Sequence, residues 1–257
     1  MIMKKSLLLA VFAAFSLAAA PATFRPYHKI AKVKGLALDT GIDHPAWKSA
    51  PSYRLMKLVY TIPDINRKPL EAGFVQYLYD DKYLYIRADF TDSDIMTNAA
   101  KDGGHFYKQG DLLEIFIKPG NANYYWEIYA TPNDLQTRFH FGSRSTVGLP
   151  SGFAHKDVGI KIVSRLNGTL NNPMDRDKGY ILLVAIPIAE LNRPHAVDGV
   201  AEYPAGTVPF APGNDWRIQS ARYNYGRYLR ETELSCYPQA YGGYHSTEYY
   251  AQIELEK

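Results

Sequence analysis

The chain has 257 residues, and its 29 Lys and Arg nearly balance its 26 Asp and Glu. Proteins that bind nucleic acid gather basic side chains on one face, so this composition gives no support to that class of partner. A single cysteine excludes an intrachain disulfide, and a chain of this length buries an adequate core without one. The 21 Tyr and 3 Trp suit β-strands as well as an aromatic binding surface.

Residues 1–22 have the pattern of a secretory signal peptide. Lys4 and Lys5 precede an apolar run from Leu7 to Ala20 that is too short to span a membrane, and small residues follow it. No later apolar stretch is long enough to span a bilayer. We therefore expect an exported protein, periplasmic or extracellular, with one domain over residues 23–257.

The segment from Phe74 to Phe90 is predicted to form a β-hairpin with Asp81 and Lys82 at its turn. This register makes one face of the hairpin wholly apolar. The facing pairs are Val75 with Ala88, Tyr77 with Ile86, and Tyr79 with Leu84.

A second hairpin is predicted from Gly110 to Ala130, with residues 119–122 as its loop. One face is again apolar, and a shift of one residue would mix it with charges. The expected pairs are Leu113 with Ile128, Ile115 with Trp126, and Ile117 with Tyr124. On the other face this register puts Glu114 directly across from Glu127. Like charges so close favour a neighbouring cation, for which Arg222 is the candidate, a metal ion, a shared proton or a ligand with hydroxyl donors.

The remaining segments also read as strands, and none shows sustained helical periodicity. Apolar and polar residues alternate over 158–165, 215–223 and 250–255, while 180–186 is nearly all apolar, as in a strand covered on both faces. This pattern predicts an all-β fold, a two-sheet immunoglobulin-like or jelly-roll β-sandwich. The predicted core contains Leu84, Ile86, Leu113, Ile115, Trp126, Ile128 and Leu183.

Eight short motifs, in this order along the chain, resemble the family 9 carbohydrate-binding modules and the wider DOMON-like group of sandwiches. They are Ala46 to Pro51, Tyr79 to Tyr85, Asp92 to Ile95, Gly110 to Phe116, Tyr124 to Pro132, Val184 to Pro187, Trp216 to Arg222 and His245 to Glu248. The resemblance implies a domain that binds a sugar or the end of a polysaccharide without cleaving it, in polysaccharide utilisation, and without a required cofactor.

The resemblance also implies which residues contact the sugar. Two tryptophans sandwich the ring in sugar-binding members, and Tyr107 and Tyr237 stand near these two positions. The polar contacts carry over to Glu114, Gln219 and Arg222, and the hairpin register adds Glu127. Some relatives bind calcium, for which Asp92 and Asp94 are candidates here. Turn and helix-cap chemistry explains such aspartates equally well.

Other functions stay open. DOMON-like relatives hold haem through Met, His or Lys, and Met96, His105 and Lys108 lie in one segment. A structural cell-surface domain that has lost binding is a further alternative. Hydrolysis by Asp111 with Glu114 fails, because residues three apart on a strand point to opposite faces. Glu114 with Glu127 has the spacing of a retaining pair, although on a flat sheet face, and the interpretation stays non-enzymatic.

Overall fold

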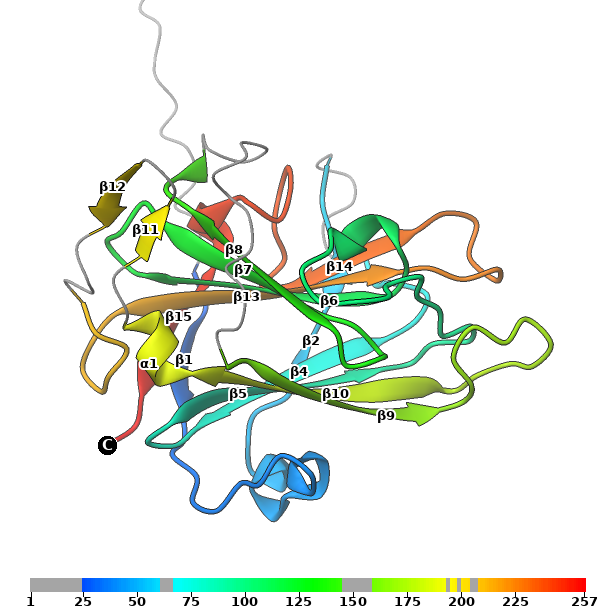
Figure 1. Cartoon of the computed structure of the whole chain (residues 1–257), viewed down its shortest axis with the longest axis horizontal. Coiled ribbons are helices and arrows are strands. Elements are labelled where there is room, and N and C mark those ends of the chain that lie inside the picture. Colours follow the sequence, from blue (N-terminus) through cyan, green and yellow to red (C-terminus); the bar gives the residue numbers. More distant parts are fainter. Residues whose placement is uncertain (1–24, 61–66, 145–158, 193–194, 198–199, 204–207) are drawn as a thin grey trace, which may run out of the picture.

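The computed structural model describes residues 25–60, 67–144, 159–192, 195–197, 200–203 and 208–257, and the predicted signal peptide lies outside them. Two β-sheets are stacked face to face, which confirms the predicted sandwich (Figure 1). Helical elements are short: α1 (Ile188–Leu191) and the 3-10 turns η1 (Gly41–Asp43), η2 (Pro45–Lys48), η4 (Phe106–Lys108) and η7 (Thr247–Tyr249). In the part of the chain that is described, no helix combines the length and apolarity needed to cross a membrane.

The smaller sheet has five strands. Their order is β2 (Tyr53–Arg54), β4 (Gly73–Tyr79), β5 (Tyr83–Phe90), β10 (Gly179–Pro187) and β9 (Lys161–Asn167). The β4–β5 hairpin has the predicted register: Tyr77 lies opposite Ile86, and the other two predicted pairs also face each other. The Asp80 carboxylate accepts hydrogen bonds from the backbone N–H groups of Lys82 and Tyr83, both at 2.7 Å, and so fixes the turn.

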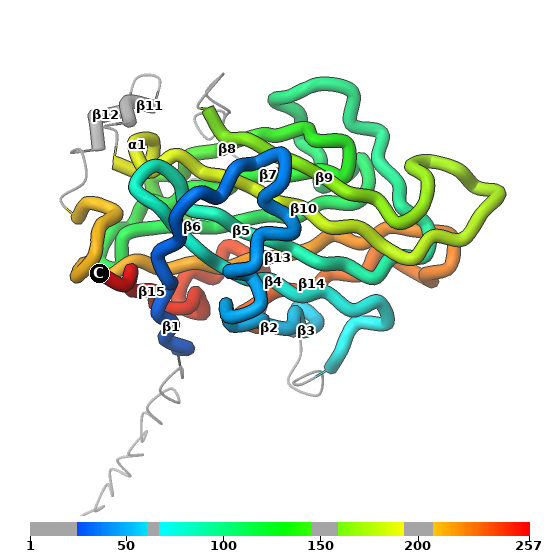
Figure 2. The backbone as a smooth tube through the Cα atoms, turned by 90° about the horizontal axis from the view of Figure 1, so that it is seen from below, coloured from blue at the N-terminus to red at the C-terminus, as the bar shows by residue number. Residues whose placement is uncertain are grey.

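Strand β10 is buried on both faces, as its unbroken apolar run predicts. One face meets the larger sheet, and the other lies under the segment 31–50, which crosses the outer side of β4, β5 and β10 (Figure 2). Trp47 belongs to this cover, and its indole N–H donates to the carbonyl of Gly41 at 2.7 Å. Leu183 packs here too, so its predicted place between the sheets is wrong, although it is fully buried.

The larger sheet has eight strands. Its main order is β1 (Tyr27–Ile30), β15 (Ala251–Leu255), β13 (Trp216–Asn224), β6 (Leu112–Pro119), β7 (Tyr125–Ala130) and β8 (Gln136–Phe141), while β14 (Glu233–Tyr237) pairs with β13 and with β3 (Met56–Lys57). Among the strands that the structure describes in this sheet, only β1 and β15 run parallel to each other. A separate ribbon pairs β11 (His195–Val197) with β12 (Val200–Tyr203).

The β6–β7 hairpin differs from its predicted register by two residues. Ile115 lies opposite Ile128, and Glu114 lies opposite Tyr129 instead of Glu127. Every side chain is on the predicted face, because side chains alternate with a period of two and a shift of two preserves the faces. The two glutamates are therefore diagonal neighbours on adjacent strands.

The core between the sheets contains the other six residues predicted for it. At its centre Trp126 stacks on Trp216 with ring centroids 5.9 Å apart and an angle of 19° between their planes. Trp126 is 1% exposed. This side chain therefore belongs to the core and not to a ligand-binding surface, as its predicted face requires.

Gly179, the first residue of β10, should not tolerate a side chain. Its φ is +134°, and a Cβ atom there would lie 1.9 Å from the carbonyl oxygen of Phe90. We expect Gly179→Ala to lower stability by about 1 to 3 kcal/mol, measured by urea unfolding. Gly242→Ala is the matched control, because Gly242 also has a positive φ but open space around it. Equal losses in the two variants would show that the contact with Phe90 is unimportant.

Candidate functional site

Two rows of side chains cross the outer face of the larger sheet. One row runs Gln219, Phe116, Glu127 and Phe139 over β13, β6, β7 and β8, and the next runs Ala221, Glu114, Tyr129 and Thr137. Glu114 and Glu127 are 2% and 3% exposed. The aromatic side chains on this face form a cluster separate from the core between the sheets. The alternation of β6 and β7 thus buries two carboxyl groups among aromatic rings.

Tyr129 lies directly across from Glu114, and it is close enough to both carboxyl groups to favour their charged forms. Burial, and after it the charge of Glu127, raises the pKa of Glu114 well above its usual value. Burial also raises the pKa of Glu127 to about 7. Two ionised carboxylates this close are unfavourable, so the pair holds a proton more tightly than free glutamates do.

His245 lies beside Glu127. Its Nδ1 is 2.8 Å from the hydroxyl of Tyr125, and its Nε2 is 3.8 Å from Oε2 of Glu127. Burial lowers the pKa of His245 to about 4, so the imidazole is neutral at pH 7 and supplies no counter-charge. The side chain is 30% exposed, and it marks a place where this site opens to solvent.

Gln219 brings a further acceptor to the same face. Its Nε2 donates to the carbonyl of Pro238 at 3.3 Å. Its Oε1 is buried, and within the described residues it has no hydrogen-bond partner. A buried acceptor without a donor is costly, and such atoms in native proteins call for a water or a ligand. We use the name carboxylate site for Glu114, Glu127, Tyr125, Tyr129, Gln219 and His245.

Partly exposed tyrosines border the carboxylate site. The rings of Tyr107, in η4, and Tyr223, in β13, have centroids 5.9 Å apart. The Tyr107 carbonyl accepts a hydrogen bond from the hydroxyl of Tyr225 at 2.5 Å, which ties its loop to the end of β13. Tyr60 is 59% exposed and lies close enough to Tyr223 and Tyr244 to interact with them electrostatically. These rings offer flat apolar faces to a ligand.

Two sequence-predicted site residues are on the other side of the sheet. Arg222 pairs with Leu113 and faces inward, whereas its neighbour Ala221 pairs with Glu114. Arg222 is therefore not the cation between the two glutamates. Tyr237 also faces inward, where it stacks on Tyr53 with centroids 4.7 Å apart and its hydroxyl is 2.7 Å from Nε2 of His28. Because Tyr107 is on the outer face, the expectation that Tyr107 and Tyr237 line one site is wrong.

The candidates for calcium and haem have other contacts. Asp92 forms an ion pair with Arg222 at 2.8 Å, and Asp94 accepts a hydrogen bond from the backbone N–H of Arg227 at 2.8 Å. His105 stacks on Phe139 at 5.0 Å, and the Lys108 ammonium lies over the ring of Tyr107. The N–H of Met96 donates to Asp111. Among the described residues, no group of three or more His, Cys, Asp or Glu has the arrangement to hold a metal ion.

Sequence reasoning missed His245 and Tyr223 as parts of this face. His245 stands in a segment outside the strands, and the sequence marked it only as the first residue of the closing motif that resembles the family. Tyr223 is four residues from Gln219 on the same strand, so alternation places both on one face. That signal was in the sequence.

Comparison with known proteins agrees with this architecture. A protein of Bacteroides uniformis, provisionally assigned as carbohydrate-binding, has a TM-score of 0.63 and 14% identity over 90% of this chain and 100% of its own. A family 9 carbohydrate-binding module of Caldicellulosiruptor kristjanssonii in complex with cellotriose has a TM-score of 0.57 and 13% identity over 90% of this chain and 93% of its own. A family 9 module of the same organism in complex with glucose has a TM-score of 0.56 and 12% identity. At these identities the likeness shows a shared fold.

No protein with a curated description matches the sequence. The sequence model of one family does match, over residues 38–201, which is more than half of the chain. That stretch includes η4 and the strands β4 to β10, and with them Tyr107, Glu114, Glu127 and Tyr129. The chain belongs to the carbohydrate family 9 binding domain-like family.

Proposed function

We propose that this is an exported, non-catalytic protein that binds a sugar or a polysaccharide end at the carboxylate site and serves polysaccharide utilisation. The observation that carries the proposal is the excess of acceptors on one buried face. Glu114, Glu127 and Oε1 of Gln219 lie there, and Oε1 of Gln219 has no hydrogen-bond partner among the described residues. Sugar hydroxyls supply donors, and hydrogen bonds to a charged acceptor are worth about 1.5 to 3 kcal/mol each.

The surroundings support a sugar more than another small molecule. Tyr107 and Tyr223 offer ring faces beside the polar groups, and this combination suits a pyranose, which has apolar C–H faces and polar edges. Solved structures of family 9 modules that share this fold are complexes with cellotriose and with glucose. Export is inferred from residues 1–22, whose pattern is that of a signal peptide.

The placement of the two glutamates argues against hydrolysis. A hydrolytic pair flanks the scissile bond from two sides of the sugar. Here the two glutamates are diagonal neighbours on one sheet face, and Tyr129 is the cross-strand partner of Glu114. Both groups can contact hydroxyls on the same side of a ligand.

The test is a glycan array followed by calorimetry on the sugars that bind. We expect Glu114→Gln to weaken binding tenfold or more, because one carboxyl oxygen becomes an amide NH2 group, which cannot accept a hydrogen bond from a sugar hydroxyl. Its melting temperature at pH 7 should equal or exceed that of the parent, because one member of a repulsive pair is removed. A variant that binds as tightly as the parent would place the sugar elsewhere. A variant that melts several degrees lower and still binds would make the pair purely structural.

Tyr107 is the aromatic residue to test. Loss of a stacking ring costs about 1 to 3 kcal/mol on other aromatic platforms, so Tyr107→Ala should weaken binding roughly fivefold or more. Tyr83→Ala is the control, because Tyr83 is also a partly buried tyrosine but belongs to the five-stranded sheet. Equal affinity of the Tyr107 variant and the parent on the same sugar would remove Tyr107 from the site.

A further inference from the structure

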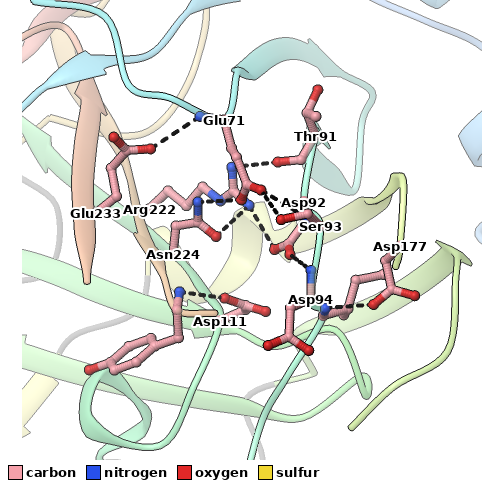
Figure 3. A network of polar contacts seen from close by, with 12 residues as sticks. Glu71, Thr91, Asp92, Ser93, Asp94, Asp111, Asp177, Arg222, Asn224 and Glu233 are labelled. Atoms are coloured by element: carbon pink, nitrogen blue, oxygen red, sulfur yellow. Dashed lines mark hydrogen bonds and ion pairs between the residues drawn. The ribbon is translucent and has the colours of Figure 1, made fainter. Parts of the chain in front are cut away.

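A buried arginine forms the centre of a polar network at one end of the sandwich (Figure 3). Arg222 is 0% exposed, although guanidinium groups are rarely buried completely. Its Nη1 donates to the carbonyl of Thr91 at 3.0 Å, and its Nη2 donates to Asp92 at 2.8 Å and to Asn224 at 2.9 Å. The guanidinium carbon, Cζ, lies 4.6 Å from the centre of the Phe90 ring. Three oxygens from two elements thus converge on one cation.

The network continues through a ring made of hydrogen bonds and the peptide bond between Asp92 and Ser93. The Asn224 amide donates to Glu71 at 2.8 Å, and the other Glu71 oxygen accepts from the N–H and the hydroxyl of Ser93. Ser93 adjoins Asp92, which returns to Arg222. Figure 3 shows these side chains pointing toward one another from the ends of β13 and β5 and from the segment that precedes β4. The ring joins segments that are far apart in the sequence.

The same network fixes the loop from β5 to β6, residues 91–111. Asp111 accepts from the N–H groups of Met96, at 2.7 Å, and Tyr225, at 2.8 Å. The N–H of Asp94 donates to Asp92 at 2.9 Å. Since this loop carries Tyr107, the order of the network bears on the aromatic border of the carboxylate site.

The carboxylate oxygens of Asp92 and Asp111 are already matched with donors. Calcium requires about six to eight oxygen ligands at about 2.3 to 2.6 Å, and relatives that bind it made Asp92 and Asp94 candidates. Both oxygens of Asp92 and both of Asp111 accept N–H bonds. Asp94 faces the N–H of Arg227, whose Nε is 3.5 Å away. These residues therefore do not fit a calcium ion, because a guanidinium and backbone amides have taken its ligands.

We infer that Arg222 holds this end of the sandwich together in the place of a metal ion, so that loop 91–111 keeps its structure without calcium. Arginine suits this role because its planar fork donates to several oxygens at once and keeps its charge when it is buried. The Arg222 guanidinium also lies over the Phe90 ring, whose face attracts a positive charge.

The first test uses the unmodified protein. Its melting temperature should be the same with a chelator and with millimolar CaCl2, and a calorimetric titration with CaCl2 should show no binding heat. A melting temperature that rises with CaCl2 or falls with the chelator would overturn the inference. This test does not depend on sugar binding.

The second test removes the cation. Arg222→Met should lower the melting temperature by roughly 10 °C, because it leaves buried carboxylates without a counter-charge. The melting temperature of Arg222→Lys, which keeps the charge without the fork, should lie between those of Arg222→Met and the parent. Arg222→Lys serves as the test variant if Arg222→Met does not fold. Arg165→Met is the control, since Arg165 pairs with Asp43 in solvent. If Arg222→Met and Arg165→Met melt at the same temperature, the inference is wrong.

Discussion

Glu127→Gln is expected to raise the melting temperature at pH 8 by roughly 6 to 12 °C and to leave it unchanged at pH 4. Burial raises the pKa of Glu127 from 4.5 to about 7. Ionising a group with this shift costs the folded state about 3 kcal/mol relative to the unfolded state. Gln has the shape of the protonated acid and has no charge to bury.

The direction of the pH dependence follows from the raised pKa. The folded state binds the proton of Glu127 more tightly than the unfolded state, so this stabilisation is complete below pH 4.5 and is lost as pH rises through 7. Buried Asp92, whose pKa is raised to about 6, acts in the same direction. His245 acts in the opposite direction, because its lowered pKa costs stability as pH falls from 6.5 toward 4.

Thermal melts of parent and variant from pH 4 to pH 8 isolate the contribution of Glu127. The difference between their melting temperatures should increase with pH between about 5 and 8. Glu231→Gln removes an exposed acid and should give no such trend. A difference that is constant with pH would show that Glu127 is already ionised at pH 5.

Trp126→Ala is expected to lower the free energy of unfolding by about 3 to 5 kcal/mol. The change removes a side chain that is 1% exposed, that stacks on Trp216 and that meets the edge of Tyr124 at 5.3 Å. Trp126→Phe should lose less, because a ring remains in the space. Urea unfolding followed by circular dichroism measures both variants.

Sugar affinity distinguishes a core role of Trp126 from a role in ligand binding. Its side chain is on the inner face of the larger sheet, and the carboxylate site is on the outer face. At a temperature where Trp126→Ala is folded, its affinity for a sugar should match that of the parent. Normal stability with lost binding would contradict the assignment of Trp126 to the core.

The two hairpins show what alternation of side chains determines. For β4 and β5 the turn is short and Asp80 fixes it, so pattern and turn together predicted the pairs. For β6 and β7, Ile115 packs equally well against Trp126 or Ile128. The apolar pattern therefore fixed the faces but not the pairing, which depends on the backbone of a longer loop.

The candidate site was predicted in part for the same reason. Glu114 and Glu127 were placed on the right face, because each lies in a strand whose apolar side is clear. Gln219 and Arg222 are three residues apart on β13, an odd number, so alternation alone excludes that both face one site. The resemblance to the family assigned both residues to one site, against this alternation. The inward position of Tyr237 depends on the pairing of β14 with β13, for which the sequence has no strong pattern.

The parallel pairing of β1 with β15 has a consequence for the order in which the molecule folds. The Tyr27 hydroxyl in β1 bonds to Glu254 in β15, 227 residues later in the chain. Closing a loop of this length costs more conformational entropy than any hairpin, and contacts so distant in sequence form slowly. As a ribosome makes the chain, β1 emerges before the other strands of the larger sheet and finds its partner last. The larger sheet is therefore completed only after β15 has been made, and until then the edge of β13 that receives β15 is open to pairing with other chains.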